Sequence, residues 1–287
     1  MQNTKFNMYC VSIDQADLDL IQKLGYIPVA LGPKNFTKEW FRDNTGKNIS
    51  QKNKWYSELT FHYWLWKNKL FKKEDDNWEG FCAYRDFWAN EEQYEIFLKD
   101  KKNFDQLNVN NYANIHKIVI KNIPNKWNDY DVVLGQEIFL NDLKISKLLK
   151  YGKLALLRNP KAFFKNGRTI KFHFDMHHGN YFLDKAIQKL DNNERDDFYN
   201  FVTTEVSYNR SCMFICRSKY VMDKFYNSLF SWLERCEEIF GFTDNNKYSE
   251  TRIYAFLAER YIPYWFKKYT NYLVWPALSF NIPRKKL

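Results

Sequence analysis

The sequence predicts an α/β fold with a mixed central sheet flanked by helices. Short apolar runs typical of buried strands alternate with stretches in which apolar residues recur every three or four positions. Apolar residues make up 45% of the 287 positions and aromatic residues 19%, which is enough for a large core. No internal repeat, low-complexity tract or linker divides the chain, so we expect a single domain over residues 1–287.

The first 54 residues predict a β-α-β unit followed by a long loop. The apolar runs 6–13 and 26–31 have the length of buried strands, and the polar–apolar stretch between them ends at Leu24. Residues 33–54 are polar and rich in turn formers. Because α/β proteins place ligand contacts on loops at strand ends, this loop is a candidate binding region.

A buried helix is expected next, over residues 55–66. Apolar residues at helical spacing cover more than one side of it: Trp55, Tyr56, Leu59, His62, Tyr63, Leu65 and Trp66. The run 78–84 then predicts a strand that ends at Arg85 and Asp86. Charge at a strand end is typical of a functional site.

The rest of the chain continues the alternation of strands and helices. Four further apolar runs predict strands: 117–120, 131–134, 154–157 and 213–216. The longest helix is expected from Lys219 to Phe240, and another from near Ser249, an N-cap candidate. His62 on the central helix and His116 before the run 117–120 are expected to be structural.

Composition and motifs argue against several classes of protein. The chain carries 44 Lys and Arg against 34 Asp and Glu, a formal charge of +10. These cations are spread among acidic neighbours, and no RRM, KH or helix-turn-helix signature occurs, so nucleic-acid binding is not expected. Neither Gly-rich phosphate loop is present. With no run long enough for a membrane span and no N-terminal signal, we expect a cytoplasmic protein.

The cysteine pattern predicts free, buried thiols. The five cysteines are an odd number without C-x-x-C spacing: Cys10, Cys82, Cys212, Cys216 and Cys236. A zinc site on the 212 and 216 thiols would need a second Cys or His pair, which the sequence does not supply.

Several segments resemble one bacterial protein family. Residues 43–68, DNTGKNISQKNKWYSELTFHYWLWKN, are similar to its pattern D-x-T-G-x-N-I-S-x-x-N-x-x-Y-x-E-L-T followed by Y-W-x-W-K-N. Residues 80–88, GFCAYRDFW, are similar to its G-x-x-H-Y-R-R strand. The later stretches 207–238 and 252–266 resemble its N-M-F-I and R-x-x-G-F-L-x-E-R-L segments. The family contains capsular and lipopolysaccharide glycosyltransferases and was first catalogued as a domain of unknown function.

The resemblance implies a GT-A-like fold and sugar transfer. Residues 1–135 would form a Rossmann-type half that binds the nucleotide-sugar donor, residues 136–275 the acceptor half, and residues 276–287 a basic tail. The expected donor is UDP-linked, with galactofuranose as one candidate sugar, and the expected acceptor is a capsule or lipopolysaccharide glycan. The chain departs from H-Y-R-R at Ala83 and Asp86, so the resemblance implies sugar transfer more than any particular metal requirement.

By resemblance, the loop and the first turn of the central helix contact the donor nucleotide. The candidates are Asn48, Ser50, Asn53, Tyr56 and Glu58, with Asn53 and Tyr56 first among them. The positive N-terminal end of a helix suits a diphosphate. The structural alternative is that the Asn and Ser side chains only cap the helix and that the Glu complements its dipole.

The strand end at residues 84–86 is the expected place for the diphosphate and for Mg²⁺ or Mn²⁺. Asp86 is a candidate catalytic residue and hard oxygen ligand for the metal. Tyr84 and Arg85 are candidates for donor binding, the guanidinium through a direct phosphate contact. The alternative is a charged strand end without a catalytic role.

Asp175, His177 and His178 form a second polar cluster. Either histidine, His177 in the first place, could complete the metal site with Asp86. The alternative is that the three hold the acceptor sugar or hydrogen-bond within a loop.

An inverting transfer also needs a carboxylate that takes the proton of the acceptor hydroxyl. Four residues are considered for this role: Asp131, Glu205, Glu250 and Glu259. We favour Glu250 and Glu259, which lie on either side of Arg252, a candidate sugar contact together with Asn209. A Glu near a helix start can also be a simple dipole partner, and a retaining enzyme would need no such base.

A non-catalytic peripheral membrane protein is the rival interpretation. Residues 260–287 interleave basic residues with aromatic ones, namely Tyr261, Trp265, Tyr269, Tyr272 and Trp275. This mixture suits an anionic membrane surface, and contact with the inner face of the membrane would also bring an enzyme to a lipid-linked acceptor. A solvated basic tail behind a core helix is the alternative.

Overall fold

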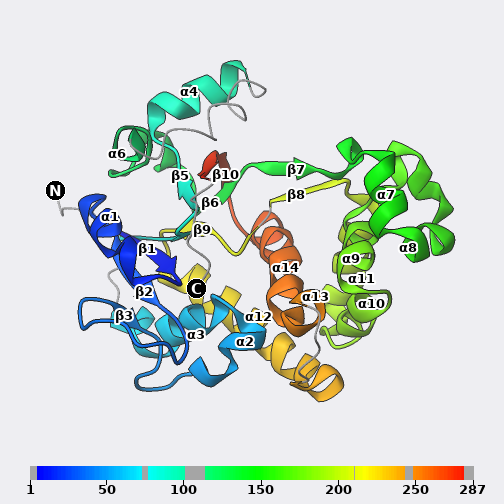
Figure 1. Cartoon of the computed structure of the whole chain (residues 1–287), viewed down its shortest axis with the longest axis horizontal. Helices are drawn as coiled ribbons and strands as arrows, with labels where there is room; N and C mark the ends of the chain where they lie inside the picture. The colour runs from blue at the N-terminus through cyan, green and yellow to red at the C-terminus, as the bar shows by residue number, and fades with distance from the viewer. Residues whose placement is uncertain (1–4, 73–76, 101–113, 210, 243–247, 281–287) are drawn as a thin grey trace.

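A nine-stranded, mostly parallel sheet forms the centre of the computed structural model (Figure 1), which describes residues 5–72, 77–100, 114–209, 211–242 and 248–280. The strands of its main path, in spatial order, are β10 (Tyr272–Trp275), β6 (Val132–Gly135), β9 (Phe214–Cys216), β4 (Trp78–Ala83), β1 (Phe6–Ser12), β2 (Ile27–Ala30) and β3 (Phe41–Arg42). On this path only β9 runs antiparallel to its neighbours. The predicted α/β class with a mixed sheet is confirmed.

The N-terminal β-α-β unit is confirmed. β1 pairs in parallel with β2, with Tyr9 opposite Ile27, and α1 (Leu18–Lys23) connects the two strands. β4 pairs in parallel on the other side of β1, with Cys82 opposite Cys10. The carboxyl ends of β1, β2 and β4 therefore meet at one edge of the sheet, where the strand order reverses and α/β proteins bind their ligands.

The predicted central helix is broken into two. α2 (Asn53–Tyr56) ends at Ser57, whose φ of 52° and ψ of −135° are not helical, and α3 (Leu59–Asn68) follows. Most of α3 is buried, as the two apolar stripes predict. Within the predicted loop 33–54 lie the two-residue strand β3 and a short 3₁₀ helix, Ser50–Lys52.

Two apolar runs predicted as strands form helices instead. The run 154–157 lies in α8 (Lys153–Arg158), where Ala155 and Leu156 are buried while Leu154 and Leu157 face solvent. A surface helix and a half-buried strand each bury one side, so an apolar run of four residues does not distinguish between them. In the run 117–120, the first two residues end α6 (Ile115–Ile118), and only an isolated bridge between Val119 and Ala89 follows.

A lobe of short helices lies beside the sheet (Figure 1, green). Its helices are α7 (Ile145–Tyr151), α8, α9 (Ile170–His178), α10 (Phe182–Ile187) and α11 (Asn192–Thr204). The segment 171–180, for which a loop was one alternative, is mostly the helix α9, capped by the Thr169 side chain. The antiparallel ribbon of β7 (Glu137–Phe139) and β8 (Ser207–Asn209) connects this lobe to the sheet.

The long C-terminal helices pack on the central helix. α12 (Lys219–Phe240) is confirmed with its predicted bounds, and α13 (Tyr248–Thr251) and α14 (Ile253–Tyr269) match the helix expected near Ser249. Aromatic rings join α12 and α14, as between Phe225 and Phe266 with centroids 4.5 Å apart. α4 (Glu91–Lys99) lies between β5 (Asp86–Trp88) and α6 in the chain. No helix in the described ranges is long and apolar enough to cross a membrane.

The predicted basic tail begins as part of the sheet. β11 (Ala277–Ser279) pairs antiparallel with β5 (Asp86–Trp88), and Leu278 and Phe280 are buried. The rest of the tail, residues 281–287, lies outside the described residues. Because β9 and β10 also belong to the sheet, residues beyond 135 contribute to the half expected to bind the donor.

The aromatic residues proposed for a membrane surface belong mainly to the core. Tyr261, Trp265 and Trp275 are buried, while Tyr269 and Tyr272 are partly exposed. The five cysteines are free and buried, as predicted. Three of the five rings therefore belong to the core, and Tyr269 and Tyr272 are the two that a membrane surface could still contact.

Candidate active site

The β4–β5 hairpin places Tyr84, Arg85 and Asp86 at the carboxyl edge of the sheet. Ala83 pairs with Asp86, so residues 84 and 85 form the turn. The Tyr84 N–H donates to the carbonyl of Val11 at the end of β1, 2.9 Å away. Arg85 is exposed, with its guanidinium 5.1 Å from the centre of the Tyr84 ring. This arrangement leaves a cation at the edge where a diphosphate would be expected.

The C-terminal segment fixes this hairpin from the side. The Ser279 hydroxyl donates to Oδ1 of Asp86, and the Phe280 N–H donates to the carbonyl of Arg85, 2.7 Å away. Asp86 is half-buried and therefore has a defined orientation at the strand end. The hairpin is thus held by residues almost 200 positions later in the chain.

The break between α2 and α3 faces the C-terminal helices. The Arg252 guanidinium donates to the Ser57 hydroxyl, 3.0 Å away. The Asn53 amide donates to the Ser57 carbonyl, 2.9 Å away, and its Oδ1 lies against Gly32, just after β2. Gly32 has a φ of 68°, and a Cβ there would lie 3.0 Å from that oxygen. Asn53 therefore holds the helix break against the sheet edge.

Two predicted carboxylates converge on the buried thiol of Cys212. Burial raises the pKa of Cys212, and the negative charges of Glu58 and Glu259 raise it further. Glu58 directly precedes α3, whereas Glu259 lies on α14. Cys212 lies two residues before β9, which is the neighbour of β4 in the sheet. The pair of carboxylates therefore lies beside the carboxyl end of β4.

Glu259 is held from two sides. The Ser211 N–H donates to its Oε1, 2.8 Å away, and the Arg260 guanidinium donates to Oε2. Ser211 has a φ of 73°, a conformation that a residue with a side chain adopts only when its surroundings impose it. Arg260 is only 1% exposed and also contacts His173 on α9, 3.4 Å away. The carboxylate has a fixed position between the sheet and the helical lobe.

Asn209 lies at the carboxyl end of β6. Its side chain is buried and donates to the carbonyl of Gly135, the last residue of β6. Its Oδ1 is buried and has no hydrogen-bond partner among the described residues. Asn209 on β8, Glu58 at the start of α3, and Arg252 and Glu259 of α14 therefore come from three elements to the same region.

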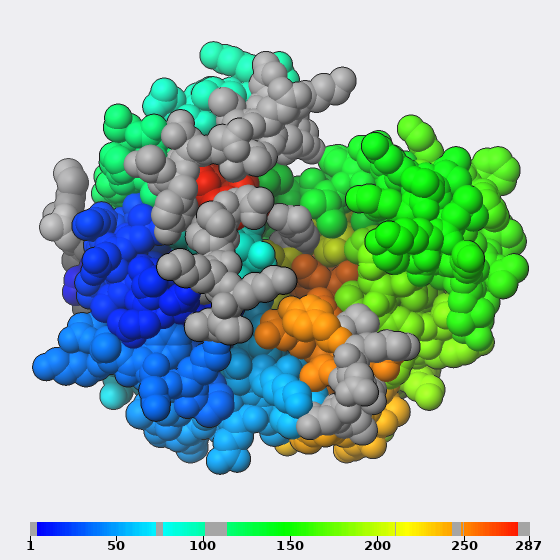
Figure 2. Space-filling model, in the orientation of Figure 1, coloured from blue at the N-terminus to red at the C-terminus, as the bar shows by residue number. Residues whose placement is uncertain are grey.

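A groove runs between the sheet and the helical lobe. Figure 2 shows the surface hollowed between the green lobe and the blue and cyan side of the molecule, with orange atoms of α14 at its floor. β8 lies at the junction between the lobe and the sheet, and Glu259 is on α14. Such a groove at the carboxyl ends of strands is the expected place for a ligand.

Other predicted donor residues have contacts within the protein. Tyr56 is 2% exposed, its ring stacks on Tyr254 at 4.7 Å, and its hydroxyl donates to Glu237 on α12, 2.6 Å away. Asn48 accepts hydrogen bonds from both the N–H and the hydroxyl of Ser50. Tyr56 thus packs in the core, and Asn48 and Ser50 form a local turn in place of the helix capping that their structural alternative expected.

The segments that carry the family resemblance fold onto each other. The Trp64 indole N–H donates to the Thr45 carbonyl, 2.7 Å away. Asn68 accepts from the N–H of Lys47 and donates to its carbonyl, at 3.1 and 2.8 Å. The D-x-T-G and Y-W-x-W-K-N patterns therefore describe, in large part, one loop fastened to the end of α3.

Asp43, which opens that pattern, is a buried carboxylate that the sequence reasoning missed. Burial raises the pKa of Asp43, against the opposing effects of Thr60 and the Gly32 N–H. Neither carboxylate oxygen has a partner that meets hydrogen-bond geometry. Its place directly after β3, at the start of the pattern, was the signal that could have drawn attention to it.

The histidines of α9 lie among aromatic rings and cations. His178 is buried and stacks on Phe256, with ring centroids 3.9 Å apart. His177 is near Arg260 and Lys147, and burial together with these two charges lowers its pKa. Among the described residues, no group of three His, Cys, Asp or Glu side chains could hold a metal ion. The cations beside His177 make it an unfavourable ligand for a further cation.

The remaining predicted residues have varied positions. Glu250 lies on the short helix α13, where the Arg252 guanidinium is 4.7 Å from the centre of the Tyr248 ring. Asp175 lies on the side of α9 that faces away from Arg260, and it forms an ion pair with Lys171. Ser57 and Ser211, which no sequence pattern singled out, have the strained backbone conformations of this region.

These features define an α/β protein with polar groups gathered at the carboxyl ends of its parallel strands. The family model described as Domain of unknown function (DUF4422) matches residues 8–271, so the chain belongs to this family. No curated protein matches it significantly. The resemblance seen in the sequence is thus supported at the level of the family.

A solved structure has a similar fold. The apo structure of the bifunctional glycosyltransferase WbbM aligns with a TM-score of 0.57 and 17% sequence identity. The alignment covers 98% of this chain but 46% of the WbbM chain, so this chain spans less than half of that protein's length. At this identity the likeness concerns the fold.

Proposed function

We propose that this chain is a glycosyltransferase that moves a sugar from a nucleotide sugar to a glycan acceptor. One observation carries the proposal: Glu58, Arg252 and Glu259 converge beside the carboxyl end of β4. That edge is where an α/β sheet binds nucleotides, and a carboxylate beside it can serve proton transfer. The fold it shares with WbbM supports the same reaction class.

In the proposed reaction, Glu259 is the general base. The acceptor hydroxyl oxygen bonds to the anomeric carbon, the bond from that carbon to the diphosphate breaks, and the nucleoside diphosphate leaves with the electron pair. The hydroxyl proton passes to the carboxylate of Glu259, whose position Ser211 and Arg260 fix. Glu259 is preferred to Glu250 because these two contacts fix the orientation of its carboxylate.

On the donor side, we assign the diphosphate to Arg85 and the sheet edge. Arg85 is exposed at the β4–β5 turn and supplies a cation with bidentate geometry. Asn53 acts indirectly by holding the helix break. We propose a UDP-linked donor, with galactofuranose among the sugars to be tested.

Mg²⁺ or Mn²⁺ is proposed as a cofactor held by Asp86 and by the donor's phosphates. Mg²⁺ commonly uses one or two carboxylates together with substrate phosphates, so a single protein carboxylate fits this mode. When bound, the ion would neutralise charge on the departing diphosphate. His177 is left out of this site because Arg260 and Lys147 lie beside it.

The proposed acceptor is a capsule or lipopolysaccharide glycan. Asn209 and Arg252, which lie near Glu259, are its proposed sugar contacts. A lipid-linked acceptor would require the enzyme to work at the inner face of the cytoplasmic membrane. Co-sedimentation with liposomes made of anionic lipids tests this location.

The decisive experiment combines donor binding with turnover. A thermal-shift panel of UDP-, GDP-, CMP- and dTDP-sugars, with and without Mn²⁺, should give stabilisation by one nucleotide class. Mass spectrometry then detects the transferred sugar on oligosaccharides from bacterial surface polysaccharides.

Asp86→Asn should abolish transfer and the effect of Mn²⁺, whereas His177→Gln should leave both unchanged. Stabilisation by none of the nucleotide sugars would favour a non-catalytic protein.

A further inference from the structure

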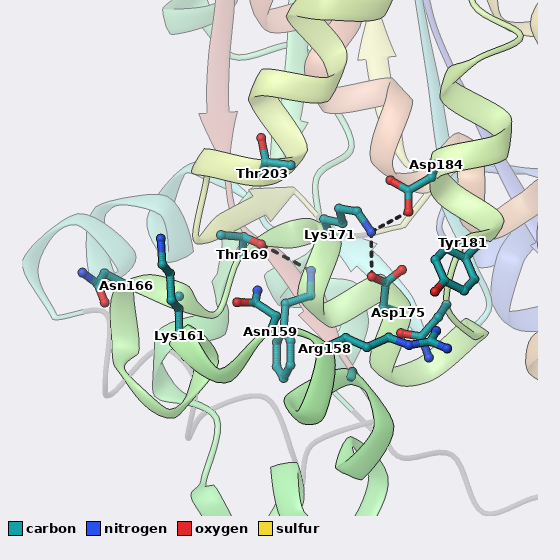
Figure 3. Close-up of a pocket in the computed structure, with 14 residues that line it drawn as sticks. Arg158, Asn159, Lys161, Asn166, Thr169, Lys171, Asp175, Tyr181, Asp184 and Thr203 are labelled. Carbon is teal, nitrogen blue, oxygen red and sulfur yellow. Dashed lines mark hydrogen bonds and ion pairs between the residues drawn. The ribbon is translucent and has the colours of Figure 1, made fainter.

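A second polar cavity lies in the helical lobe, apart from the groove. Its volume is about 450 Å³, within the range of about 300–1,000 Å³ typical of small-molecule sites. Side chains from α8, α9, α10 and the turn before α10 line it (Figure 3). Those used in the argument below are Arg158, Asn159, Lys171, Asp175, Tyr181 and Asp184.

The helix α9 separates this cavity from the proposed active site. Lys171 and Asp175, one turn apart, line the cavity. His173 and His177 point the other way, toward Arg260, because positions two residues apart lie on opposite sides of a helix. A ligand in the cavity would therefore share a wall with the groove without touching the reacting atoms.

Tyr181 gives the cavity an aromatic surface. Its side chain is 54% exposed, and the Arg158 guanidinium lies 4.4 Å from the ring centre. Tyr181 has a φ of 73°, a conformation that favours glycine. An exposed ring kept at a strained position indicates a functional role for the ring, since packing does not require it.

The polar groups of the cavity include both fixed donors and fixed acceptors. Lys171 bridges Asp175 and Asp184 with ion pairs of 2.7 and 2.9 Å, drawn as dashed lines in Figure 3. The second oxygen of Asp175, Oδ1, is buried without a hydrogen-bond partner. Asn159 adds an amide that can donate and accept. Hydroxyl groups, which also donate and accept, match such a set better than a purely anionic ligand does.

We propose that this cavity binds a sugar unit of the growing glycan chain, away from the end that reacts. The ring of Tyr181 would stack on the apolar face of the sugar, while Arg158, Asn159 and the carboxylates would bind its hydroxyl groups. The site would retain long acceptors between transfers. The choice of a glycan as ligand rests on the proposed function, but its binding can be measured without transfer.

Affinity electrophoresis of the full chain tests the proposal. The gel contains surface polysaccharide purified from the source organism, and retardation reports binding. Tyr181→Gly removes the ring and suits the backbone at that position, so it should fold normally. We expect it to weaken polysaccharide binding by roughly tenfold or more. Tyr220→Ala is the matched control, since Tyr220 is 63% exposed with the Lys224 ammonium 4.2 Å from its ring centre.

Kinetics give an independent measure. For Tyr181→Gly, KM should rise for long polysaccharide acceptors and stay unchanged for a short oligosaccharide, with kcat unchanged for both. The thermal shift caused by the nucleotide sugar should be the same as in the unsubstituted chain. If no nucleotide sugar binds, the proposed function fails. The electrophoresis result would still show whether the cavity binds the polysaccharide.

Two results would overturn the inference. One is equal retardation of the unsubstituted chain and Tyr181→Gly. The other is retardation by dextran sulfate that equals retardation by the polysaccharide and vanishes in high salt, because the cavity would then be only a cationic patch.

Discussion

The backbone N–H of Ser211 donates a 2.8 Å hydrogen bond to Oε1 of Glu259, joining the segment before β9 to α14. Ser211 makes this bond from a left-handed backbone conformation, with a φ of 73°. Glu259 therefore has a position set by the sheet as well as by its own helix. A fixed carboxylate next to a strand end is what proton transfer at a defined point requires.

Replacement of Glu259 by Gln should abolish most of the transfer activity. Gln retains an oxygen that can accept from the Ser211 N–H, but its NH2 cannot accept from the buried Arg260 guanidinium, so urea unfolding and the donor thermal shift are measured beside turnover to separate lost catalysis from lost folding. Loss of a general base typically lowers the rate by about 10²–10⁴-fold. Steady-state kcat measured beside Glu250→Gln checks this expectation. Near-normal turnover in Glu259→Gln would place the base elsewhere, and loss only in Glu250→Gln would identify it.

Two substitutions of Ser57 should separate backbone strain from the loss of its hydroxyl. Both Ser57→Gly and Ser57→Ala remove the acceptor for Arg252, but only Gly suits a φ of 52° with a ψ of −135°. We expect the Gly variant to be about 1 kcal/mol more stable than the Ala variant, after the entropy of glycine in the unfolded chain is counted. Urea unfolding of the two proteins measures the difference. Equal stabilities would mean that this backbone conformation stores no strain.

Gly46 should tolerate alanine poorly. It has a φ of 56°, and a Cβ there would fall onto Oδ1 of Asn68, the atom that accepts from the Lys47 N–H. We expect Gly46→Ala to lower the free energy of unfolding by about 2–3 kcal/mol, from backbone strain and a disrupted hydrogen bond. Gly25→Ala is the control: φ is 75°, no atom lies within 4 Å of the added Cβ, and the expected cost is about 1 kcal/mol. A smaller loss in Gly46→Ala than in the control would contradict the packing argument.

His62 should make the fold sensitive to mild acid. Burial lowers the pKa of His62 to about 3 from its ordinary value of 6.5, and its Nδ1 lies 3.0 Å from the Tyr226 hydroxyl. The unfolded chain therefore binds a proton on this residue between pH 6.5 and pH 3 that the folded protein does not. The stability contributed by neutral His62 is complete above pH 6.5 and is lost as the pH falls through this window.

Between pH 6.5 and pH 4, this effect should cost roughly 3 kcal/mol. His62→Gln cannot titrate but keeps a polar group near Tyr226, so its stability should fall less over the same interval. Thermal unfolding of both proteins at a series of pH values gives the comparison. Parallel curves would show that other groups cause the acid sensitivity.

Local sequence patterns predicted the elements whose apolar residues follow a long or regular period. β1, β2, β4 and the 22-residue helix α12 are of this kind. The break at Ser57 could not be predicted, because the sequence around it continues a helical pattern. It depends on contacts with Asn53 and with Arg252, which is 195 residues away in the chain. The strands β5 and β11 have only three residues each, which is too short to show an alternating pattern of apolar and polar residues.

The candidate site was predicted in part. Asp86, Glu58, Asn209, Arg252 and Glu259 were named from the sequence, but not their convergence, which depends on how β9 and α14 pack beside β4. Tyr56 fits the family pattern, yet its hydroxyl bonds to Glu237. A motif shows that a residue type belongs at a position, and only packing distinguishes a ligand contact from a core contact.

The place of β9 between β4 and β6 limits how chains of this family can be rearranged. The strand that joins the two parts of the N-terminal sheet comes from residues 214–216. A fragment ending at residue 135 would leave the facing edges of β4 and β6 open to pairing with other chains. The parts of the chain before and after residue 135 therefore cannot be exchanged between relatives as separate units, and chimeras need their junctions in surface loops that leave all nine strands from one parent.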